Sequence, residues 1–105
     1  APGDIEQAVL FLHDHLTSED VVLTIVPDDA PVWYYFSRYH LSDQYLFDIK
    51  KRPFRDALVL VNELRGETLA STLAQRPSFA ENLDLPSARL VYQQNHYAIY
   101  EVPHR

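Results

Sequence analysis

The chain has 105 residues, a net charge of −6 at neutral pH and no cysteine. Its length suits one domain with one core, and a hydrophobic content of 47% indicates a packed globule. The net negative charge argues against a nucleic-acid partner. The lack of cysteine excludes disulfides, thiolate metal sites and thiol catalysis. Because methionine is also absent, we expect a processed product or a piece of a longer protein. No apolar run reaches the roughly 18–20 residues that span a bilayer.

The first half of the chain predicts a helix, a buried strand and a second helix. Apolar residues recur at helical spacing from Asp4 to Leu16, with Asp4 as the expected N-cap and Gln7 completing a capping box. Val21 to Val26 is a β-branched run, as expected for a strand buried on both faces. Pro27 ends that strand. The next helix, Val32 to His40, has a predicted core face of Val32, Tyr35, Phe36 and Tyr39.

The second half predicts further strands, one more helix and a closing hairpin. The expected strands are Tyr45–Ile49, Ala57–Val61, Arg89–Gln93 and Tyr97–Val102, the last two joined by Gln94-Asn95-His96. Glu67 to Gln75 predicts a helix that Pro77 ends, and Ser78 to Pro86 is irregular with one helical turn around Phe79. This order predicts an α/β fold: a small three-layer sandwich with a mostly parallel sheet of about five strands and a C-terminal antiparallel hairpin.

Two adjacent carboxylates, Asp28 and Asp29, follow the first strand. Open α/β folds usually place ligands at this edge of the sheet. Such a pair is able to bind a divalent cation or to divide acid and base roles. Capping of the next helix also accounts for an aspartate at this place, and we favour capping.

Three more side chains join this candidate ligand site: Trp33, Asn62 and Arg65. Trp33 lies off the apolar face of its helix, where an aromatic ring either stacks on a ligand or covers the core. Asn62 and Arg65 follow the third strand and face the aspartates if the first and third strands are neighbours. Arg65 would then hold a phosphate or carboxylate, although a salt bridge or a turn contact is the simpler role.

The only basic feature is the segment from Lys50 to Arg55. It holds four of the nine cations of the chain, namely Lys50, Lys51, Arg52 and Arg55. Two interpretations stay open for it. The segment contacts anionic lipid head groups, or it is a solvated loop that offsets an acidic surface.

No pattern for catalysis or for a cofactor is recognisable. The five histidines are scattered without zinc-ligand spacing, and the serines lack a nucleophile-elbow context. The phosphate-binding pattern Gly-x-Gly-x-x-Gly is absent. We therefore expect no catalytic residue, no metal and no cofactor in this domain.

Three segments together resemble one known protein family. The first combines Ala8-Val-Leu-Phe-Leu12, Glu19-Asp-Val-Val-Leu23 and Asp29-Ala-Pro-Val-Trp-Tyr-Tyr-Phe36. The second is Ala57-Leu-Val-Leu-Val-Asn-Glu-Leu-Arg-Gly-Glu-Thr-Leu69, and the third joins Arg89-Leu-Val-Tyr92 to Tyr97-Ala-Ile-Tyr-Glu-Val102. In this order they are similar to the soluble C-terminal domain of polytopic glycosyltransferases, the relatives of dolichyl-phosphate-mannose protein mannosyltransferases and of lipid A aminoarabinose transferases. The likeness covers most of the chain, but not Lys50 to Arg55.

The resemblance implies a location and a role. Members of the family use a polyprenyl-phosphate-linked sugar as donor, and their catalytic acidic residues lie in the membrane part. No catalytic residue is therefore carried onto this chain. The resemblance implies a non-catalytic accessory domain on the extracytoplasmic (periplasmic) face of a membrane. Its partners would be the transmembrane portion of its own parent chain and either a lipid-linked sugar or the membrane surface.

A function of a different class stays open. The chain is then a stand-alone small-molecule-binding α/β domain, with its site at the C-terminal ends of the strands around Asp28, Asp29 and Asn62. A small hydrolase is a weaker third alternative, because nucleophile, base and oxyanion elements do not form a recognisable set.

Overall fold

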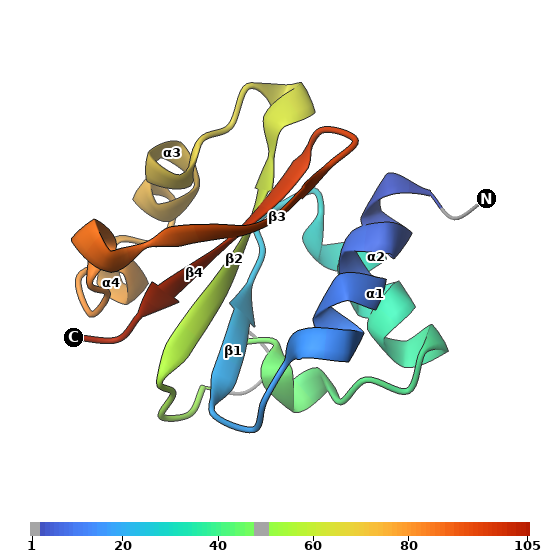
Figure 1. Ribbon diagram of the computed structural model, residues 1–105, viewed down its shortest axis with the longest axis horizontal. Helices are drawn as coiled ribbons and strands as arrows, with labels where there is room; N and C mark the ends of the chain where they lie inside the picture. Colours follow the sequence, from blue (N-terminus) through green and yellow to red (C-terminus); the bar gives the residue numbers. More distant parts are fainter. Residues whose placement is uncertain (1–2, 48–50) are drawn as a thin grey trace.

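The computed structural model describes residues 3–47 and 51–105 and arranges them in three layers (Figure 1). The helices are α1 (Asp4–His15), α2 (Asp29–Arg38), α3 (Leu69–Ala74) and α4 (Pro77–Ala80), and the strands are β1 (Asp20–Leu23), β2 (Asp56–Asn62), β3 (Arg89–Gln94) and β4 (Tyr97–Pro103). The strands form one sheet in the order β1-β2-β4-β3. Helices α1 and α2 cover one face of the sheet, and α3 and α4 cover the other (Figure 1).

The sheet is mixed, so the expected mostly parallel sheet of about five strands was wrong. Only β1 and β2 pair in parallel, whereas β4 is antiparallel to both β2 and β3. The sheet is mixed because the β3–β4 hairpin joins it through β4, which pairs with β2. A two-residue turn at Asn95 and His96, with φ of 51° and 74°, makes β3 and β4 antiparallel. The more apolar β4, with Ala98, Ile99 and Val102 buried, takes the place beside β2 and leaves β3 at the edge.

The strand expected at Tyr45–Ile49 is replaced by a short 3₁₀ helix, η1 (Asp43–Tyr45), and a single bridge. Ser42 caps η1 by accepting a hydrogen bond from the Gln44 backbone N–H at 3.2 Å. Leu46 then bridges Val22 in parallel, and the Phe47 N–H donates to the Val22 carbonyl at 3.1 Å. Residues 48 and 49 of the expected strand lie outside the described part of the chain.

One face of the sheet is covered by the two longer helices, α1 and α2. Val32 and Phe36 of α2 are buried against Leu58 and Leu60 of β2, and Tyr35 and Tyr39 pack beside them, which confirms the predicted core face. The expected cap of α1 was wrong. Gly3 is the N-cap and makes no side-chain bond, whereas Asp4 lies in the first turn, where a carboxylate is favourable to the helix dipole.

The opposite face is covered by short elements. Helix α3 begins later than expected, because Thr68 and Ser71 form a capping box that starts the helix at Leu69. The helical turn expected around Phe79 is present as α4. Leu73 of α3, Phe79 of α4 and Leu83 pack on this side with Val59 and Val61 of β2.

Strand β1 is shorter than the apolar run that predicts it. Its pairing with β2 ends at Leu23, and Thr24 and Ile25 are buried beyond the strand. The chain then turns, with the Asp28 N–H donating to the Ile25 carbonyl at 2.9 Å. Val26 is consequently 69% exposed instead of buried. This turn ends the strand and sets the position of Asp28.

Candidate functional site

Strand periodicity brings polar side chains together at one end of the sheet. Leu58 and Leu60 of β2 face α1 and α2, so Asn62, two residues further, faces the same side. Asn62 is in register with Tyr97, the first residue of β4. The turn after β1, the strand next to β2, delivers Asp28 directly before α2.

Asp28, Asn62 and Tyr97 form what we call the strand-end cluster. The Tyr97 hydroxyl donates to Asp28 Oδ1 at 3.0 Å. Asn62 Nδ2 lies 3.3 Å from Oδ1 and 3.2 Å from Oδ2 of the same carboxylate, and 3.4 Å from the Tyr97 hydroxyl. The exposed fractions of Asp28 and Asn62 are only 7% and 5%. The carboxylate is therefore bound by donors of its own chain.

Burial and the charge of Asp28 decide the protonation of Tyr97. Burial first, and then the adjacent Asp28 carboxylate, raise the pKa of Tyr97 to about 12. The phenol therefore keeps its proton to a higher pH than a free tyrosine does, and it acts as the donor to Asp28. The Oδ1 atom of Asn62 is buried and has no hydrogen-bond partner among the described residues. A buried acceptor of this kind is usually satisfied by an ordered water molecule.

Arg65 joins the cluster only through another acid. The Asn62 backbone N–H donates to Glu67 Oε1 at 3.1 Å, and Glu67 Oε2 lies 3.8 Å from Arg65 Nε. The Arg65 side chain is 56% exposed. This contact is a salt bridge, which was one of the simpler roles expected for Arg65.

The other predicted site residues lie apart from the cluster. Asp28 is the N-cap residue of α2 but makes no side-chain cap bond, because its carboxylate is bound by Asn62 and Tyr97. Asp29 is exposed, and its Oδ1 accepts a hydrogen bond from the Ala30 N–H at 3.0 Å. Trp33 is 53% exposed and borders a separate hollow of about 210 Å³ that also involves Asp43.

Tyr97 is the member of the cluster that sequence reasoning missed. Its place at the start of an alternating strand predicts only that it faces one side of the sheet. Its contact with Asn62 depends on β4 lying beside β2. The signal was present in the apolar character of β4, which favours a central position over an edge.

The arginines of the basic segment are bound within the chain. Arg52 donates to the Gln44 carbonyl at 3.1 Å, to the Ser18 carbonyl at 3.0 Å and also to the Asp20 carbonyl. Arg55 forms ion pairs of 2.9 Å with Glu19 and with Asp56. Lys51 is exposed, and Lys50 lies outside the described residues.

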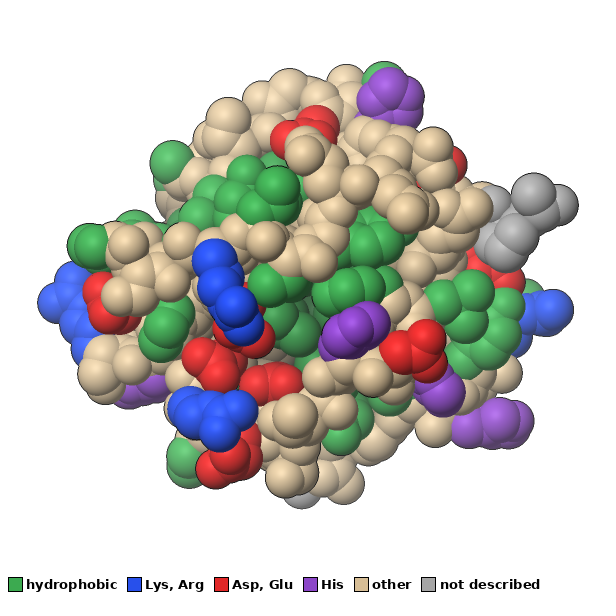
Figure 2. Space-filling view, viewed as in Figure 1, with side chains coloured by type: hydrophobic (Ala, Val, Ile, Leu, Met, Phe, Trp, Pro, Cys, Tyr) green, Lys and Arg blue, Asp and Glu red, His purple; other side chains and the backbone are tan. Residues whose placement is uncertain are grey.

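Acidic and basic side chains are mixed on this part of the surface. Figure 2 shows both signs close together at the lower left of the face, over the beginnings of β1 and β2 in Figure 1. Near the start of β2, Arg55 pairs with Glu19 and Asp56, so charges of both signs lie next to one another there. The arrangement supports the interpretation that this segment offsets acidic charge, and lipid contact stays a prediction.

No metal-binding group of three or more His, Asp or Glu residues occurs within residues 3–47 and 51–105. In that same part of the chain, no helix has the length and apolar character needed to cross a membrane. Comparison of the chain with models of known protein families, with curated proteins and with solved structures finds no match.

Proposed function

We propose that this chain is a non-catalytic accessory domain of a membrane glycosyltransferase that uses a polyprenyl-phosphate-linked sugar donor, located on the extracytoplasmic face. The observation that carries the proposal is the place of the three resembling segments. They comprise the middle of α1 with β1 and most of α2, then most of β2 with its following turn, and finally most of the β3–β4 hairpin. These segments supply every strand of the four-stranded sheet. The resemblance therefore follows the framework of the fold.

The hydrogen bonds of the strand-end cluster support a structural role for Asp28. Asp28 lies directly before the first resembling helix segment, Asn62 belongs to the second segment and Tyr97 to the third. Their hydrogen bonds tie the three segments together. A carboxylate bound in this way stabilises the fold instead of acting on a substrate, which agrees with chemistry in another part of a parent chain.

Two exposed apolar side chains mark the surface that we propose for contact with the membrane part. Val26 follows β1 and is 69% exposed, and Leu64 follows β2 and is 71% exposed. Because β1 and β2 are parallel, both turns follow the C-terminal ends of the strands, on the same side of the sheet. A partner that covered this end of the sheet would bury both side chains.

The first test is the reading frame that precedes Ala1. The proposal expects it to encode many apolar segments of about 20 residues each. A frame without such segments would contradict the proposal directly, whatever the domain itself does in solution.

The second test is a transfer assay with a polyprenyl-phosphate-linked sugar as donor. The full-length chain is expected to transfer sugar, and the isolated domain is expected to transfer none. The double variant Val26→Ser with Leu64→Ser should lower transfer by the full-length chain. Leu90→Ser is the matched control, because Leu90 is also exposed but lies on edge strand β3. If the double variant, the Leu90→Ser control and the unaltered full-length chain transferred sugar equally well, the proposed contact surface would be excluded.

A second candidate function is a stand-alone small-molecule-binding domain with its site at the strand ends. The observation that favours it is the buried Oδ1 of Asn62 beside Asp28, which has no partner among the described residues. A neutral ligand with hydroxyl donors suits such an acceptor. Titration of the labelled domain with glucose should then shift the NMR signals of the Asn62 side-chain amide. Asp28→Asn should weaken the shift, whereas Asp29→Ala should leave it unchanged because Asp29 lies apart from the cluster. An unchanged amide signal in the unaltered domain would exclude this candidate.

A further inference from the structure

A small hollow lies beside helix α2, where the chain turns back after the helix. It has a volume of about 210 Å³ and is lined by Trp33, Phe36, Ser37, Leu41 and Asp43. We call it the Trp33 hollow. It shares no residue with the strand-end cluster, so its chemistry is separate from that of Asp28.

One wall of the Trp33 hollow is a face of α2. Trp33 and Ser37 are four positions apart in the helix, so their side chains lie on the same face. Phe36 between them is fully buried in the core, which places a fixed apolar floor beneath the hollow.

The other wall follows from the turn after α2. His40, with a φ of 57°, reverses the chain, and the Leu41 N–H donates to the Phe36 carbonyl at 2.8 Å. Ser42 then caps η1, which begins at Asp43. Hydrogen bonds to the backbone therefore hold this wall in place before any ligand is bound.

The side chains around the hollow are accessible. Trp33 is 53% exposed and is the only tryptophan of the chain. Ser37 and Asp43 are exposed as well, and neither side chain makes a hydrogen bond or an ion pair within residues 3–47 and 51–105. The hollow thus offers an aromatic face, a hydroxyl and a carboxylate to a ligand.

These three groups suit a sugar ring. The face of an aromatic ring carries partial negative charge, so it attracts the C–H groups that line the faces of a pyranose. A carboxylate accepts hydrogen bonds and a serine hydroxyl both donates and accepts, so together they match neighbouring sugar hydroxyls. The Asp43 carboxylate and the net charge of −6 disfavour an anion. The chemistry therefore selects a neutral ring with several hydroxyls.

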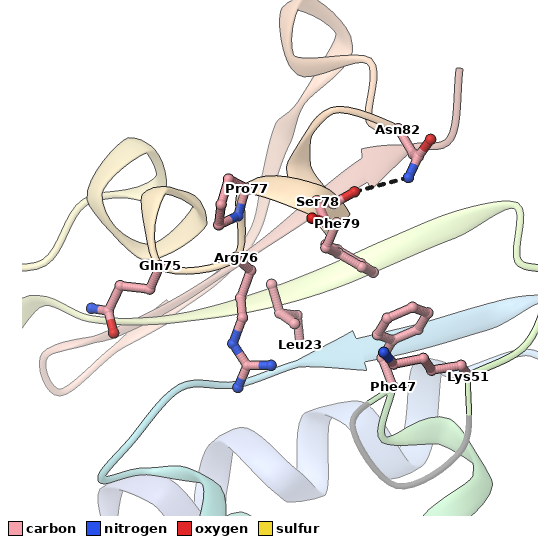
Figure 3. A pocket seen from close by; sticks show the side chains of 9 residues that line it. All are labelled: Leu23, Phe47, Lys51, Gln75, Arg76, Pro77, Ser78, Phe79 and Asn82. Carbon is pink, nitrogen blue, oxygen red and sulfur yellow. Dashed lines mark hydrogen bonds between the residues drawn. The ribbon is translucent and has the colours of Figure 1, made fainter.

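A larger hollow, the pocket beside Lys51 and Arg76, lies on the other side of the sheet and has a volume of about 340 Å³. In Figure 3, Leu23 and Phe79 lie between these two cations. The Arg76 guanidinium is engaged within its own chain, and its Nη2 lies 3.5 Å from the Thr24 carbonyl. The smaller Trp33 hollow is the one whose polar side chains are accessible to a ligand.

We propose that the Trp33 hollow binds one neutral sugar ring. One face of the ring stacks on Trp33, and its hydroxyls form hydrogen bonds with Asp43 and Ser37. Because drug-sized ligands occupy sites of roughly 300–1,000 Å³, a hollow of about 210 Å³ suits a single ring. The proposal goes beyond the accessory role, and binding by the 105-residue chain does not depend on a parent chain.

The test is NMR titration of the labelled 105-residue chain with methyl β-glucopyranoside, whose equatorial substituents leave C–H groups on both ring faces. The signal of the Trp33 indole N–H should shift and saturate, with a dissociation constant on the order of 1 mM, as expected for one ring at an open site. Sorbitol, which has hydroxyls but no ring, should leave the indole signal unchanged.

Two substitutions separate stacking from hydrogen bonding, with the backbone amides of Ser37 and Leu41 as the signals. Trp33→Leu keeps an apolar side chain but removes the ring, and it should weaken binding by about tenfold. Asp43→Asn keeps the size but removes the charge, and it should weaken binding by about fivefold, because hydrogen bonds to charged groups are stronger.

Each substitution has a matched control outside the hollow. Tyr34→Leu removes a neighbouring aromatic ring that is 59% exposed, and Asp14→Asn removes an exposed carboxylate of α1. Neither residue lines the hollow, so both variants should bind like the unaltered chain. If Trp33→Leu fails to fold, Asp43→Asn and its control decide the question.

Three results would overturn the proposal. The first is no saturable shift of the indole signal, including the case in which only the Asn62 side-chain amide shifts, which would place the sugar at the strand-end cluster instead. The second is equal affinity of Asp43→Asn and Asp14→Asn, or of Trp33→Leu and Tyr34→Leu. The third is an indole signal that shifts with protein concentration alone, which would identify a second copy of the chain as the occupant.

Discussion

The strand-end cluster and the pocket beside Lys51 and Arg76 handle charge in opposite ways. In the cluster, the Asp28 carboxylate is 7% exposed, and both of its oxygens accept hydrogen bonds from Asn62 or Tyr97. At the pocket, the cations border an open hollow of about 340 Å³ on an apolar floor. The first arrangement is closed on itself, whereas the second leaves room for another molecule.

This difference separates a buried charge that stabilises the fold from an exposed charge, that of Lys51, at the rim of a surface hollow. A buried charge with partners from its own chain is costly to disturb, because removing one partner leaves the others unsatisfied. A charge at an open rim costs little to remove and changes mainly what is attracted to it. The edge of the sheet that the sequence pattern marked as a site is thus the more structural of the two regions.

The largest expected effect is on stability, from Asp28→Ala. This change leaves the donors of Asn62 and Tyr97 buried without their acceptor, at a cost of about 2–4 kcal/mol in the free energy of unfolding. Asp29→Ala is the matched control, since the neighbouring aspartate is exposed and should cost about 0.5 kcal/mol or less. Urea denaturation of both variants measures the difference.

Asp28→Asn separates the charge of Asp28 from its shape. It keeps the size of the side chain but weakens its acceptance of two donors, so its loss of stability should fall between those of the two alanine variants. If Asp28→Ala and Asp29→Ala were equally stable, the cluster would not hold the fold, and the contrast between the two regions would fail.

The next effect is a loss of stability in alkaline solution that depends on Tyr97. Its pKa is raised to about 12 in the folded state, against about 10 for a free tyrosine. The folded state therefore holds this proton more tightly, so the stabilisation is complete below about pH 10 and is lost as the pH rises toward about 12. Tyr97→Phe should cost about 1 kcal/mol at neutral pH and reduce the alkaline slope.

Unfolding free energies measured across this pH range test the assignment. Tyr100→Phe is the control, because Tyr100 lies on the same strand but faces the other side of the sheet. Some alkaline loss should remain in Tyr97→Phe. The hydrogen bond to Glu6 raises the pKa of Tyr39, and burial raises the pKa of Tyr92. An unchanged slope in Tyr97→Phe would remove Tyr97 from this role.

Local signals in the sequence predicted much of this fold. The helical face of Val32 and Phe36, the terminal hairpin and the helical turn at Phe79 follow from spacing and turn residues, and the structure confirms them. The meeting of Asp28 and Asn62 was expected if the first and third predicted strands were neighbours, and β1 and β2 do pair. Each of these inferences depends on few residues close in sequence.

What could not be predicted depends on long-range pairing. The apolar character of β4 favours its place beside β2, but no local pattern sets the register that brings Tyr97 to Asn62 and Asp28. The strand expected from Tyr45 was replaced because Ser42 stabilises a 3₁₀ turn. The pocket depends on Phe47 meeting Phe79 across 32 positions of the chain, and on the Arg76 side chain crossing to Thr24. None of these contacts has a sequence motif.

The smallest expected effect is that of Lys51→Gln on stability, and it is the sharpest test of the contrast. Because Lys51 is exposed at the rim of the pocket, the free energy of unfolding should change by about 0.5 kcal/mol or less, measured by urea denaturation. Arg89→Gln, an exposed cation paired with Glu101, should change it by a similarly small amount. A loss as large as that of Asp28→Ala would show that Lys51 holds the fold, and the two regions would then no longer differ in kind.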